Sequence, residues 1–443
     1  MTFNNLLESH DILEEHEEVA AVTSNAAADL PKLPWLTNYQ DPQLFKEGEL
    51  QPIYALFNEI SHQKNVSDVI ISPGLPVIIK VKRKGLFAIT KRTLDYLEAA
   101  SLVRVITNNQ HAISTVKEGM PLSGIGRLIQ GDVVDLHAAE TYVEYAFQRK
   151  TRYRYEIVGS SSAEQESSFS MVLRPIPSEP PVYSDLNIPL DFVNDCIVTQ
   201  GIVIIGGATG EGKTTLLSSI IRYILENDTQ IKGNIITHED PIEIAYDLIK
   251  SQHSYVTQSA IGPHIKTFDL ANSAAMRRSS DLILVGELRD NQSVDKAVEL
   301  SLTGHPVFAT THASNVSAIL PRLLSRFPKE MQTQKCFDII EASRVFASQK
   351  LIWTTDGKIM AVREHLKFTP PLRAYLKRYT DDPTIVARKI SGIMARGLFG
   401  VVNFEMQGRD LLQKNIINVE NYRHLVDATD PLDKETLEAL DEC

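Results

Sequence analysis

The stretch IVIIGGATGEGKTTLLSSIIRYIL, residues 202–225, decides the fold of the larger part of this chain. Its middle, GATGEGKT at 207–214, fits the phosphate-binding loop pattern of a glycine, four free positions and Gly-Lys-Thr. The apolar run 202–205 predicts a buried strand before the loop, and apolar residues at helical spacing from 216 to 225 predict a helix after it. A strand, a glycine-rich loop and a helix in this order predict an α/β domain that binds the phosphates of a nucleotide.

The residue types of this loop suit ATP with Mg²⁺. Glycines let backbone N–H groups turn inward around the β-phosphate, and the start of the following helix adds a positive dipole. Lys213 supplies a cation to the β- and γ-phosphate oxygens, and Thr214 offers a hydroxyl to Mg²⁺. Glu211 is an anion inside an anion site, so we expect its side chain to point outward. The predicted ATP-binding residues are Gly207, Ala208, Thr209, Gly210, Glu211, Gly212, Lys213, Thr214 and Thr215.

Further apolar runs continue the pattern after the loop. The runs 234–237, 282–285 and 307–309 alternate with helical patterns, which predicts a mostly parallel sheet covered by helices on both faces. One of these helical patterns contains Pro321. Because proline lacks the N–H that a helix interior uses, we expect that helix to begin near Ala318.

Acidic residues and a histidine follow three of the predicted strands. Glu239, Glu287 and His312 each stand at the carboxyl end of an apolar run, where a parallel sheet places its ligands. Glu287 is similar to a Walker B acid, although Gly286 stands where Asp usually does, and we expect Glu287 to reach Mg²⁺ partly through water. Taken singly, such an acid is often a helix cap and such a histidine often structural. The P-loop and these three positions, all at strand ends and in this order along the chain, favour a catalytic site.

The composition excludes several classes of protein. The chain has 443 residues, of which 43% are hydrophobic and 23% charged, as in ordinary globular proteins. No stretch approaches the roughly 20 apolar residues of a membrane span, and the first residues lack the layout of a signal peptide. Cys196, Cys336 and Cys443 are too scattered for a disulfide framework, and the His and Cys spacings match no common zinc site. These features predict a soluble protein of a reducing cytoplasm.

The net charge of −11 is concentrated at the two ends. Residues 1–31 carry −7 and residues 427–443 carry −6, so the residues between them sum to +2. Acidic ends are usually solubilising tails, and a partner-docking arm is the alternative. With the proline cluster at 175–181 as a boundary, we divide the chain into an acidic arm (1–38), a small α+β domain (39–177), a linker (178–185), a P-loop domain (186–365), a helical appendage (366–426) and an acidic tail (427–443).

Four motifs in one order resemble the type II/type IV secretion ATPases. They are GATGEGKT, EDPIE at 239–243, LVGELRD at 284–290, and TGH with TTH between 303 and 312. Among the pilus members of the family, the PilT retraction motors look most similar. The resemblance covers about residues 145–425 and includes RYR at 152–154, VLRPIP at 172–177 and LKFTPPLR at 366–373. The segment VTQSAIGPHI at 256–265 is similar to the DotB/TraJ branch of type IVB secretion and IncI-type conjugation.

The resemblance implies a hexameric ring whose subunits have a PAS-like amino-terminal domain and a RecA-like P-loop motor domain. It implies that Glu239 polarises the attacking water, that Glu287 is the Walker B acid and that His312 lies near the γ-phosphate. The arginines that match those supplied near the subunit boundary are Arg152, Arg154 and Arg174, with Arg277 and Arg289 ranked below them. Such a cation stabilises transition-state charge.

The function that follows is an ATPase that powers a type IVB secretion or conjugative apparatus. We expect it to be cytoplasmic, to be recruited to the cytoplasmic face of the inner membrane and to contact inner-membrane components. A type IV pilus retraction or assembly motor is the alternative within the family. A RecA-like nucleic-acid translocase ranks lower, because the near-neutral body has no clear basic-aromatic stripe, and no specific nucleic-acid binding is expected. A nucleotide-gated docking protein with little turnover is disfavoured by the full set of acids.

Overall fold

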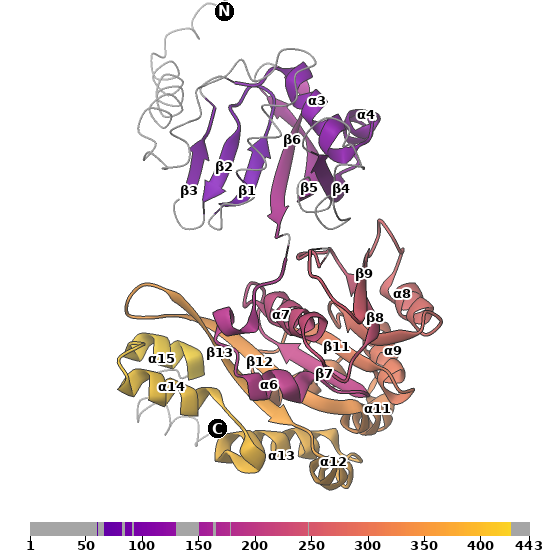
Figure 1. The fold of residues 1–443 in the computed structure, drawn as a ribbon, viewed down its shortest axis with the longest axis vertical. Helices are drawn as coiled ribbons and strands as arrows, with labels where there is room; N and C mark the ends of the chain where they lie inside the picture. Colours follow the sequence, from indigo (N-terminus) through magenta and orange to yellow (C-terminus); the bar gives the residue numbers. More distant parts are fainter. Residues whose placement is uncertain are drawn as a thin grey trace, which may run out of the picture. The chain divides into compact units, whose positions relative to one another are not determined.

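The computed structural model describes residues 60, 66–81, 85–90, 93–129, 150–162, 165–177, 179–246 and 248–426. The chain forms two compact units, residues 1–178 and 179–443 (Figure 1). The division falls within the predicted linker 178–185, and the predicted arm 1–38 and tail 427–443 lie outside the described residues. Within the described ranges, no helix is long and apolar enough to cross a membrane.

The described part of the amino-terminal unit is an antiparallel sheet with two helices. The strands, in sheet order, are β3 (Gly85–Ala88), β2 (Ile78–Val81), β1 (Val66–Ile71), β6 (Gln165–Ile176), β5 (Lys150–Ser162) and β4 (Leu122–Ile129). The helices are α3 (Tyr96–Thr107) and α4 (Ala112–Lys117). Asp95 starts α3, because its side chain accepts the N–H of Glu98 while the Glu98 side chain accepts the N–H of Asp95. Both helices pack on this sheet and form one hydrophobic core with it.

The proline cluster that marks the predicted boundary begins inside the last strand of this unit, which ends within the predicted bounds 39–177. Pro175 and Ile176, part of the proline cluster, belong to β6 and pair with β5. On the other side of β6 the ladder to β1 ends at Leu173. Pro175 therefore lies where β6 has a partner on one side only, and a strand tolerates proline at such an edge.

The carboxyl-terminal unit is built on the predicted, mostly parallel sheet. Its described strands, in sheet order, are β13 (Ile359–Lys367), β12 (Ser343–Trp353), β7 (Gly201–Gly206), β11 (Pro306–Thr311), β10 (Ser280–Val285), β8 (Gly233–Glu239) and β9 (Ser254–Ala260). Every neighbouring pair from β12 to β9 is parallel, and β13 is antiparallel to β12. The predicted α/β class with a mostly parallel sheet is therefore confirmed.

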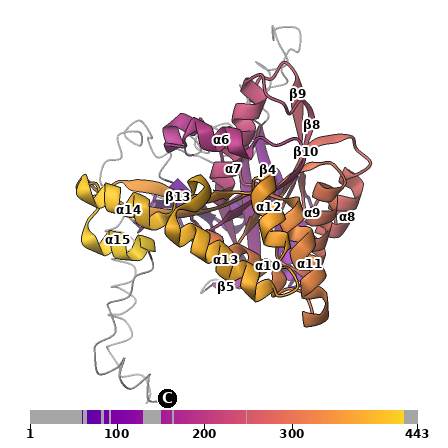
Figure 2. The ribbon, with the colours of Figure 1, turned by 90° about the horizontal axis from the view of Figure 1, so that it is seen from below.

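Helices cover both faces of this sheet, as the continuous apolar strands predict. On one face Val203 and Ile205 pack with η1 (Tyr183–Leu186), α6 (Leu190–Cys196) and α7 (Lys213–Glu226). On the other face Ile202 and Ile204 pack in a second core with α8 (Phe268–Ala275), α9 (Asn291–Leu302), α10 (Val316–Leu324), α11 (Lys329–Ala342), α12 (Pro370–Lys377) and α13 (Pro383–Arg396). Figure 2 shows α6 and α7 on one side and α10 to α13 on the other.

The segment 366–426 does not form one separate helical layer. β13 runs to Lys367, across the predicted boundary at 365/366, and α12 and α13 share the larger core of the sheet. η2 (Leu398–Gly400) follows α13. A small cluster of its own forms where α14 (Phe404–Gln413) and α15 (Val419–Val426) pack on β12 and β13. The β12–β13 ladder thus joins the P-loop sheet to the last helices.

The prediction that the helix around Pro321 begins near Ala318 is wrong. α10 begins at Val316, because the side chain of Asn315 accepts the N–H of Ala318 at 2.9 Å and caps the helix. Pro321 lies in the second turn, where it removes one hydrogen bond, to the carbonyl of Ser317. The buried apolar face of α10 offsets that loss.

Candidate active site

The P-loop connects β7 to α7, and its own carbonyls hold the Lys213 side chain. Gly212 has φ of 74°, a left-handed conformation that glycine adopts without strain, and from it the chain enters α7. The Lys213 Nζ donates to the carbonyls of Gly207 at 2.8 Å and Ala208 at 2.9 Å. Burial lowers the pKa of Lys213, while the nearby Glu287 opposes that shift. The ammonium group is therefore held within the loop by neutral acceptors that an anion can outcompete.

Glu211 points away from the anion site, as predicted. Its carboxylate accepts the backbone N–H of Leu351 on β12, and its carbonyl accepts a hydrogen bond from the Gln349 side chain. The acid thus fastens the loop to β12 and does not place its charge in the anion site.

Glu239 is a buried carboxyl at the end of β8. It is 5% exposed, and burial raises its pKa from the ordinary 4.5 to about 7. Its Oε1 accepts hydrogen bonds from Thr237 Oγ1 at 2.6 Å and from Gln258 Nε2 at 3.1 Å. Gln258 also donates to the carbonyl of Ile244 at 2.8 Å, so the carboxyl is held in one orientation. A fixed carboxyl with a pKa near neutrality suits a general base.

Glu287 lies between two cationic or potentially cationic partners. His312 Nε2 lies 2.8 Å from its Oε1, and Arg289 Nε donates to its Oε2 at 2.6 Å. Arg289 also contacts Asp240 through Nη1 at 2.8 Å, which links the segment after β10 to the acidic segment after β8. The Arg289 guanidinium group thus forms ion pairs with two acids of this chain, Glu287 and Asp240.

Gly286 explains the missing Walker B aspartate. A Cβ at this position would lie 3.0 Å from the carbonyl oxygen of His238 and 3.3 Å from the Cα of Glu239. The Gly286 N–H also donates to the His238 carbonyl at 2.7 Å. The segment after β10 therefore lies against the end of β8, at a distance that leaves little room for a side chain.

The structure brings four of the predicted segments to one edge of the sheet. The strand order β7, β11, β10, β8 is parallel throughout, so the P-loop, His312, Glu287 and Glu239 all follow carboxyl ends at that edge. Thr214 and Thr215 lie in the first turn of α7 and are half-buried. The catalytic roles of these residues remain predictions.

The predicted arginines belong to the other unit. Arg152 and Arg154 lie on β5, and Arg174 lies on β6 directly opposite Arg154. Arg174 forms an ion pair with Asp68 of β1, whose side chain is 7% exposed, at 2.8 Å. Of the lower-ranked alternatives, Arg277 follows α8 and is exposed, and Arg289 is engaged as described. A role for any of them at a subunit boundary stays a prediction.

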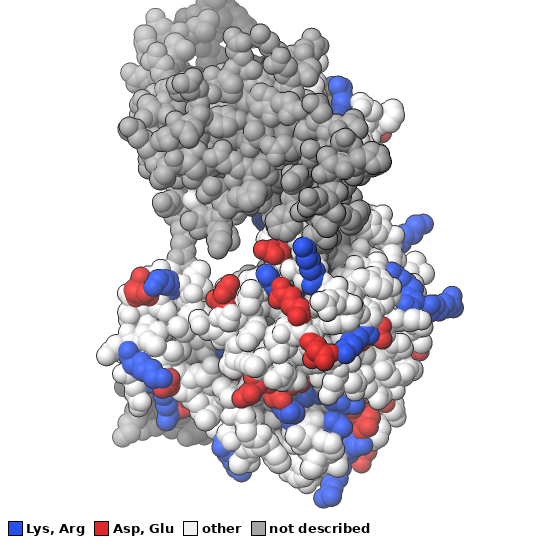
Figure 3. Space-filling view, viewed as in Figure 1, with Lys and Arg blue, Asp and Glu red and all other residues white. Residues whose placement is uncertain are grey.

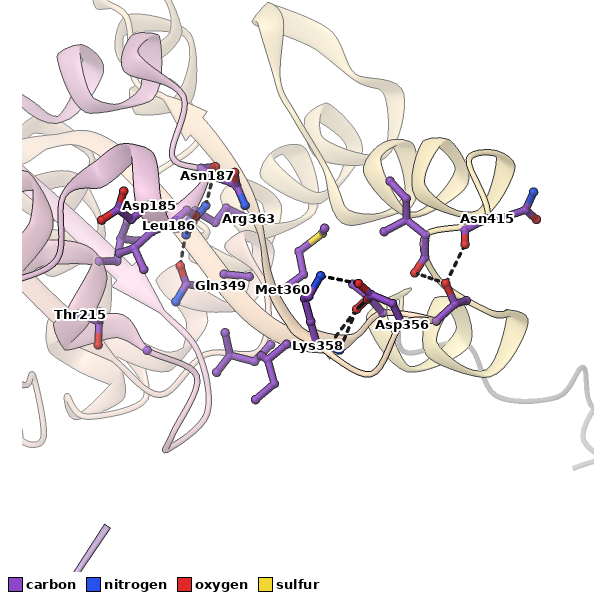
Figure 4. A pocket seen from close by; sticks show the side chains of 18 residues that line it. Asp185, Leu186, Asn187, Thr215, Gln349, Asp356, Lys358, Met360, Arg363 and Asn415 are labelled. Carbon is purple, nitrogen blue, oxygen red and sulfur yellow. Dashed lines mark hydrogen bonds and ion pairs between the residues drawn. The ribbon is translucent and has the colours of Figure 1, made fainter. Parts of the chain in front are cut away.

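A cavity of about 600 Å³ opens beside the P-loop (Figure 4). Gly212 of the P-loop and Thr215 and Leu216 of α7 line it on one side, and Leu351 and Met360 line it from the β12–β13 ladder. Its size falls within the range of small-molecule sites in proteins.

Sequence reasoning did not assign a function to several residues that shape this site. Thr237 and Gln258 hold Glu239, and Gln349 and Arg363 lie behind the P-loop. Gln258 stood within a segment that indicated the family, but a neutral side chain carries no motif of its own. Gln349 and Arg363 lie more than 130 residues after the loop, and the pairing of β12 with β7 brings them to it.

Comparison with known proteins places the chain among secretion and pilus proteins. The family described as Type II/IV secretion system protein matches residues 190–440. The structure is similar to that of the ATPase DotB of Yersinia pseudotuberculosis, with a TM-score of 0.71 and 32% identity over 88% of this chain and 96% of that one. The sequence is 29% identical to the type IV pilus ATPase PilU of Pseudomonas aeruginosa over 71% of this chain and 74% of that one. It is 30% identical to the type IV pilus retraction ATPase PilT of the same organism over 62% and 78%.

Proposed function

This chain belongs to the Type II/IV secretion system protein family and is an ATPase of the P-loop NTPase class, and we propose that it powers a type IVB secretion or conjugative DNA-transfer apparatus. The observation that carries the proposal is the similarity to DotB, which extends over 96% of that protein at 32% identity. The structure of the pilus retraction motor PilT is matched over 99% of its chain, but at 22% identity, which shows a shared fold alone. We further propose a cytoplasmic homo-hexamer that is recruited to the inner membrane by components of the apparatus.

The geometry of the site supports ATP hydrolysis by activated water. Glu239, with its pKa near 7, takes the proton of the attacking water. Lys213 leaves the loop carbonyls and stabilises the β- and γ-phosphate charge, and His312 contacts the γ-phosphate side of the site. The adenosine part of ATP takes the cavity beside Gly212 and Thr215. Arg152, Arg154 or Arg174 of a neighbouring subunit supplies the further cation.

The donor set fits Mg²⁺ as the second cofactor. Thr214 offers a hydroxyl and Glu287 a carboxylate whose side chain is 18% exposed, and Mg²⁺ prefers oxygen ligands. Within the described ranges, no cluster of three or more His, Cys, Asp and Glu could hold a metal by itself, so Thr214 and Glu287 would bind Mg²⁺ together with the nucleotide. When bound, Mg²⁺ neutralises charge on the β- and γ-phosphates.

The experiment that tests this function replaces Lys213 by Ala. We expect purified Lys213→Ala protein to lose ATP turnover, and the host that carries it to lose transfer through the apparatus. Lys232→Ala, which removes an exposed lysine of the same unit away from the cavity, is the matched control for expression and folding. Transfer at the wild-type level from the Lys213→Ala strain would contradict the proposal.

A pilus retraction or assembly motor is the second candidate, because PilU and PilT match more than 60% of this chain. Loss of pilus retraction with intact transfer in the Lys213→Ala strain would favour it. A nucleic-acid translocase ranks below both. On the face shown in Figure 3, Lys and Arg are interspersed with Asp and Glu over the carboxyl-terminal unit. A translocase predicts DNA-stimulated turnover that falls steeply with salt.

A further inference from the structure

Gln349 of β12 lies directly behind the P-loop. It is 2% exposed, and its Nε2 donates to the carbonyl of Glu211. A Cβ at Gly212 would lie 2.9 Å from that Nε2, and a Cβ at Gly207 would lie 2.8 Å from the Gln349 carbonyl oxygen. Both glycines have positive φ values, which favour glycine. The loop also packs on Gln349 at a distance that leaves no space for a side chain at either position. A movement of the loop therefore moves, or is resisted by, Gln349.

Arg363 of β13 continues this contact away from the loop. It lies opposite Gln349 in the β12–β13 ladder, and its Nε donates to Gln349 Oε1 at 2.7 Å. Its Nη1 and Nη2 donate to the carbonyls of Asn187 at 3.2 Å and Leu186 at 3.0 Å, as Figure 4 shows. The guanidinium group thus bridges the sheet and the end of η1.

The burial of Arg363 has a cost that a surface arginine does not have. The residue is 8% exposed, and burial lowers its pKa to about 10. Throughout the described ranges it has no ion-pair partner, and its side-chain acceptors are one amide and two backbone carbonyls. Three fixed donors in one plane match these three acceptors, which a lysine or an apolar residue does not. The three hydrogen bonds of the guanidinium group, and not the pairing of its charge with an acid, therefore explain why an arginine suits this position.

The segment that Arg363 holds is the one by which the chain enters the carboxyl-terminal unit. That unit starts at Glu179, and η1 with Asn187 follows within ten residues. The N–H of Asn187 donates to Ser184 and that of Ile188 to Tyr183, both at 3.1 Å, so these two amides report whether the η1 turn is intact. Gln349 and Arg363 link this turn to the P-loop by side-chain hydrogen bonds, and Leu186 and Asn187 also line the cavity beside the loop.

We propose that Gln349 and Arg363 are positioning residues that couple nucleotide occupancy of the P-loop to the η1 segment, residues 183–187. This inference rests on ATP binding at the P-loop, as in the function proposed above. The Lys213 ammonium group donates to loop carbonyls, and the phosphates of ATP compete for it, so we expect ATP binding to shift the loop and the Gln349 side chain that it contacts. Because the coupling of two sites is reciprocal, the position of η1 also sets the affinity for ATP.

Hydrogen exchange at the amides of Asn187 and Ile188 tests the coupling. The full chain is measured with Mg²⁺ alone, with tripolyphosphate and with a non-hydrolysable ATP analogue, each ligand at a concentration that saturates the variant. Because Leu186 and Asn187 line the cavity proposed for adenosine, tripolyphosphate, which occupies the P-loop alone, separates coupling from direct contact.

In the wild-type protein we expect both ligands to change these exchange rates at least about threefold, as a change of about 0.7 kcal/mol in local opening would. In Arg363→Met we expect tripolyphosphate to cause no change at these amides, while exchange in the P-loop still responds. Lys367→Met, which removes a cation of the same strand that pairs with Asp195, is the matched control and responds as wild type.

A second pair of variants separates coupling from a purely structural role. Gln349→Leu removes both side-chain bonds, and we expect it to raise the KM for ATP about fivefold with a smaller change in kcat, as the loss of about one hydrogen bond to the binding loop does. Gln349→Glu keeps the acceptor for Arg363 but loses the donor to Glu211, so it is expected to raise KM while Arg363 still holds η1 in the apo state. Melting temperatures identify any variant that fails to fold.

Two results would overturn the coupling: wild-type amides at 187 and 188 whose exchange does not change with tripolyphosphate, or Arg363→Met amides that respond to it as the wild type does. The assay needs binding only, so its outcome is independent of the apparatus that the protein serves. A chain that binds ATP and moves η1 but supports no transfer contradicts the proposed function alone. A chain that supports transfer without a response of η1 contradicts the coupling alone.

Discussion

Glu239 is the residue whose environment most directly predicts a pH dependence. Burial in the free protein raises its pKa to about 7, and the deprotonated form is the one that accepts a proton from water. We therefore expect kcat/KM for ATP to rise with pH and to reach half its plateau near pH 7. Steady-state turnover between pH 5.5 and 9 measures this. Gln258→Leu removes a donor to the carboxylate and should move the midpoint upward, and a midpoint below pH 6 in the wild type would contradict the assignment.

The same pKa predicts a stability effect with a definite sign. Between the ordinary 4.5 and about 7 the unfolded chain has released the Glu239 proton while the folded chain retains it, so stability falls as pH rises through this window. Glu239→Gln removes the ionisable group. We expect it to be more stable than wild type at pH 8 by on the order of 2–3 kcal/mol and about equal at pH 4. Urea unfolding at both pH values checks this, and a variant that is less stable at pH 8 would refute the burial argument.

At the residue scale the sequence identified side chains that belong to motifs and missed those that support them. Lys213, Glu287 and His312 were predicted because each follows an apolar run, and parallel strands end at one edge. Gln258 and Gln349 hold the site by hydrogen bonds, and a glutamine looks the same in sequence whether it is exposed or buried. Their roles depend on strand pairings between distant segments, which local periodicity does not contain.

At the scale of elements, α10 shows how a cap can outweigh a proline. Pro321 removes one hydrogen bond in the second turn, yet the helix begins where Asn315 caps it. We expect Pro321→Ala to stabilise the protein by about 1 kcal/mol, because the N–H it restores can donate to the Ser317 carbonyl. Thermal or denaturant unfolding measures the change. Pro370→Ala is the control, since Pro370 is the first residue of α12, where no such bond is lost, and it should change stability by less than about 0.5 kcal/mol.

Element order was easier to predict than element membership. Short apolar runs predicted four of the described strands of the P-loop sheet, β7, β8, β10 and β11, each within about two residues of its bounds, whereas β9, β12 and β13 were not predicted. The helices α12 and α13 were assigned to an appendage, whereas Leu372 and Ile390 are buried in the main core. An amphipathic helix shows which of its faces is buried but not which sheet or helix covers that face.

At the scale of the whole molecule, the proposed ring makes each ATP site depend on two subunits. If an arginine of β5 acts on the ATP of a neighbouring subunit, then Lys213→Ala and Arg154→Ala each abolish turnover for different reasons. Lys213→Ala subunits lack a working P-loop but keep the arginine, and Arg154→Ala subunits keep the P-loop but lack the arginine. Where an Arg154→Ala P-loop meets a Lys213→Ala neighbour, a complete site forms again.

Mixing the two inactive proteins in equal amounts, with exchange of subunits, should therefore restore about a quarter of wild-type ATPase activity, since random assembly around a symmetric ring gives that share of complete sites. Steady-state turnover of the mixture measures it. The control mixes Lys213→Ala with Glu239→Gln. Both residues lie in the carboxyl-terminal unit, so every subunit in this mixture lacks one residue that its own ATP site needs, and no complete site forms. The same experiment with Arg152→Ala and Arg174→Ala ranks the three arginines. Arg174 forms an ion pair with the buried Asp68, so we expect Arg174→Ala to lower stability as well. If none of the three arginine variants restores activity when mixed with Lys213→Ala, the cation lies elsewhere in the chain.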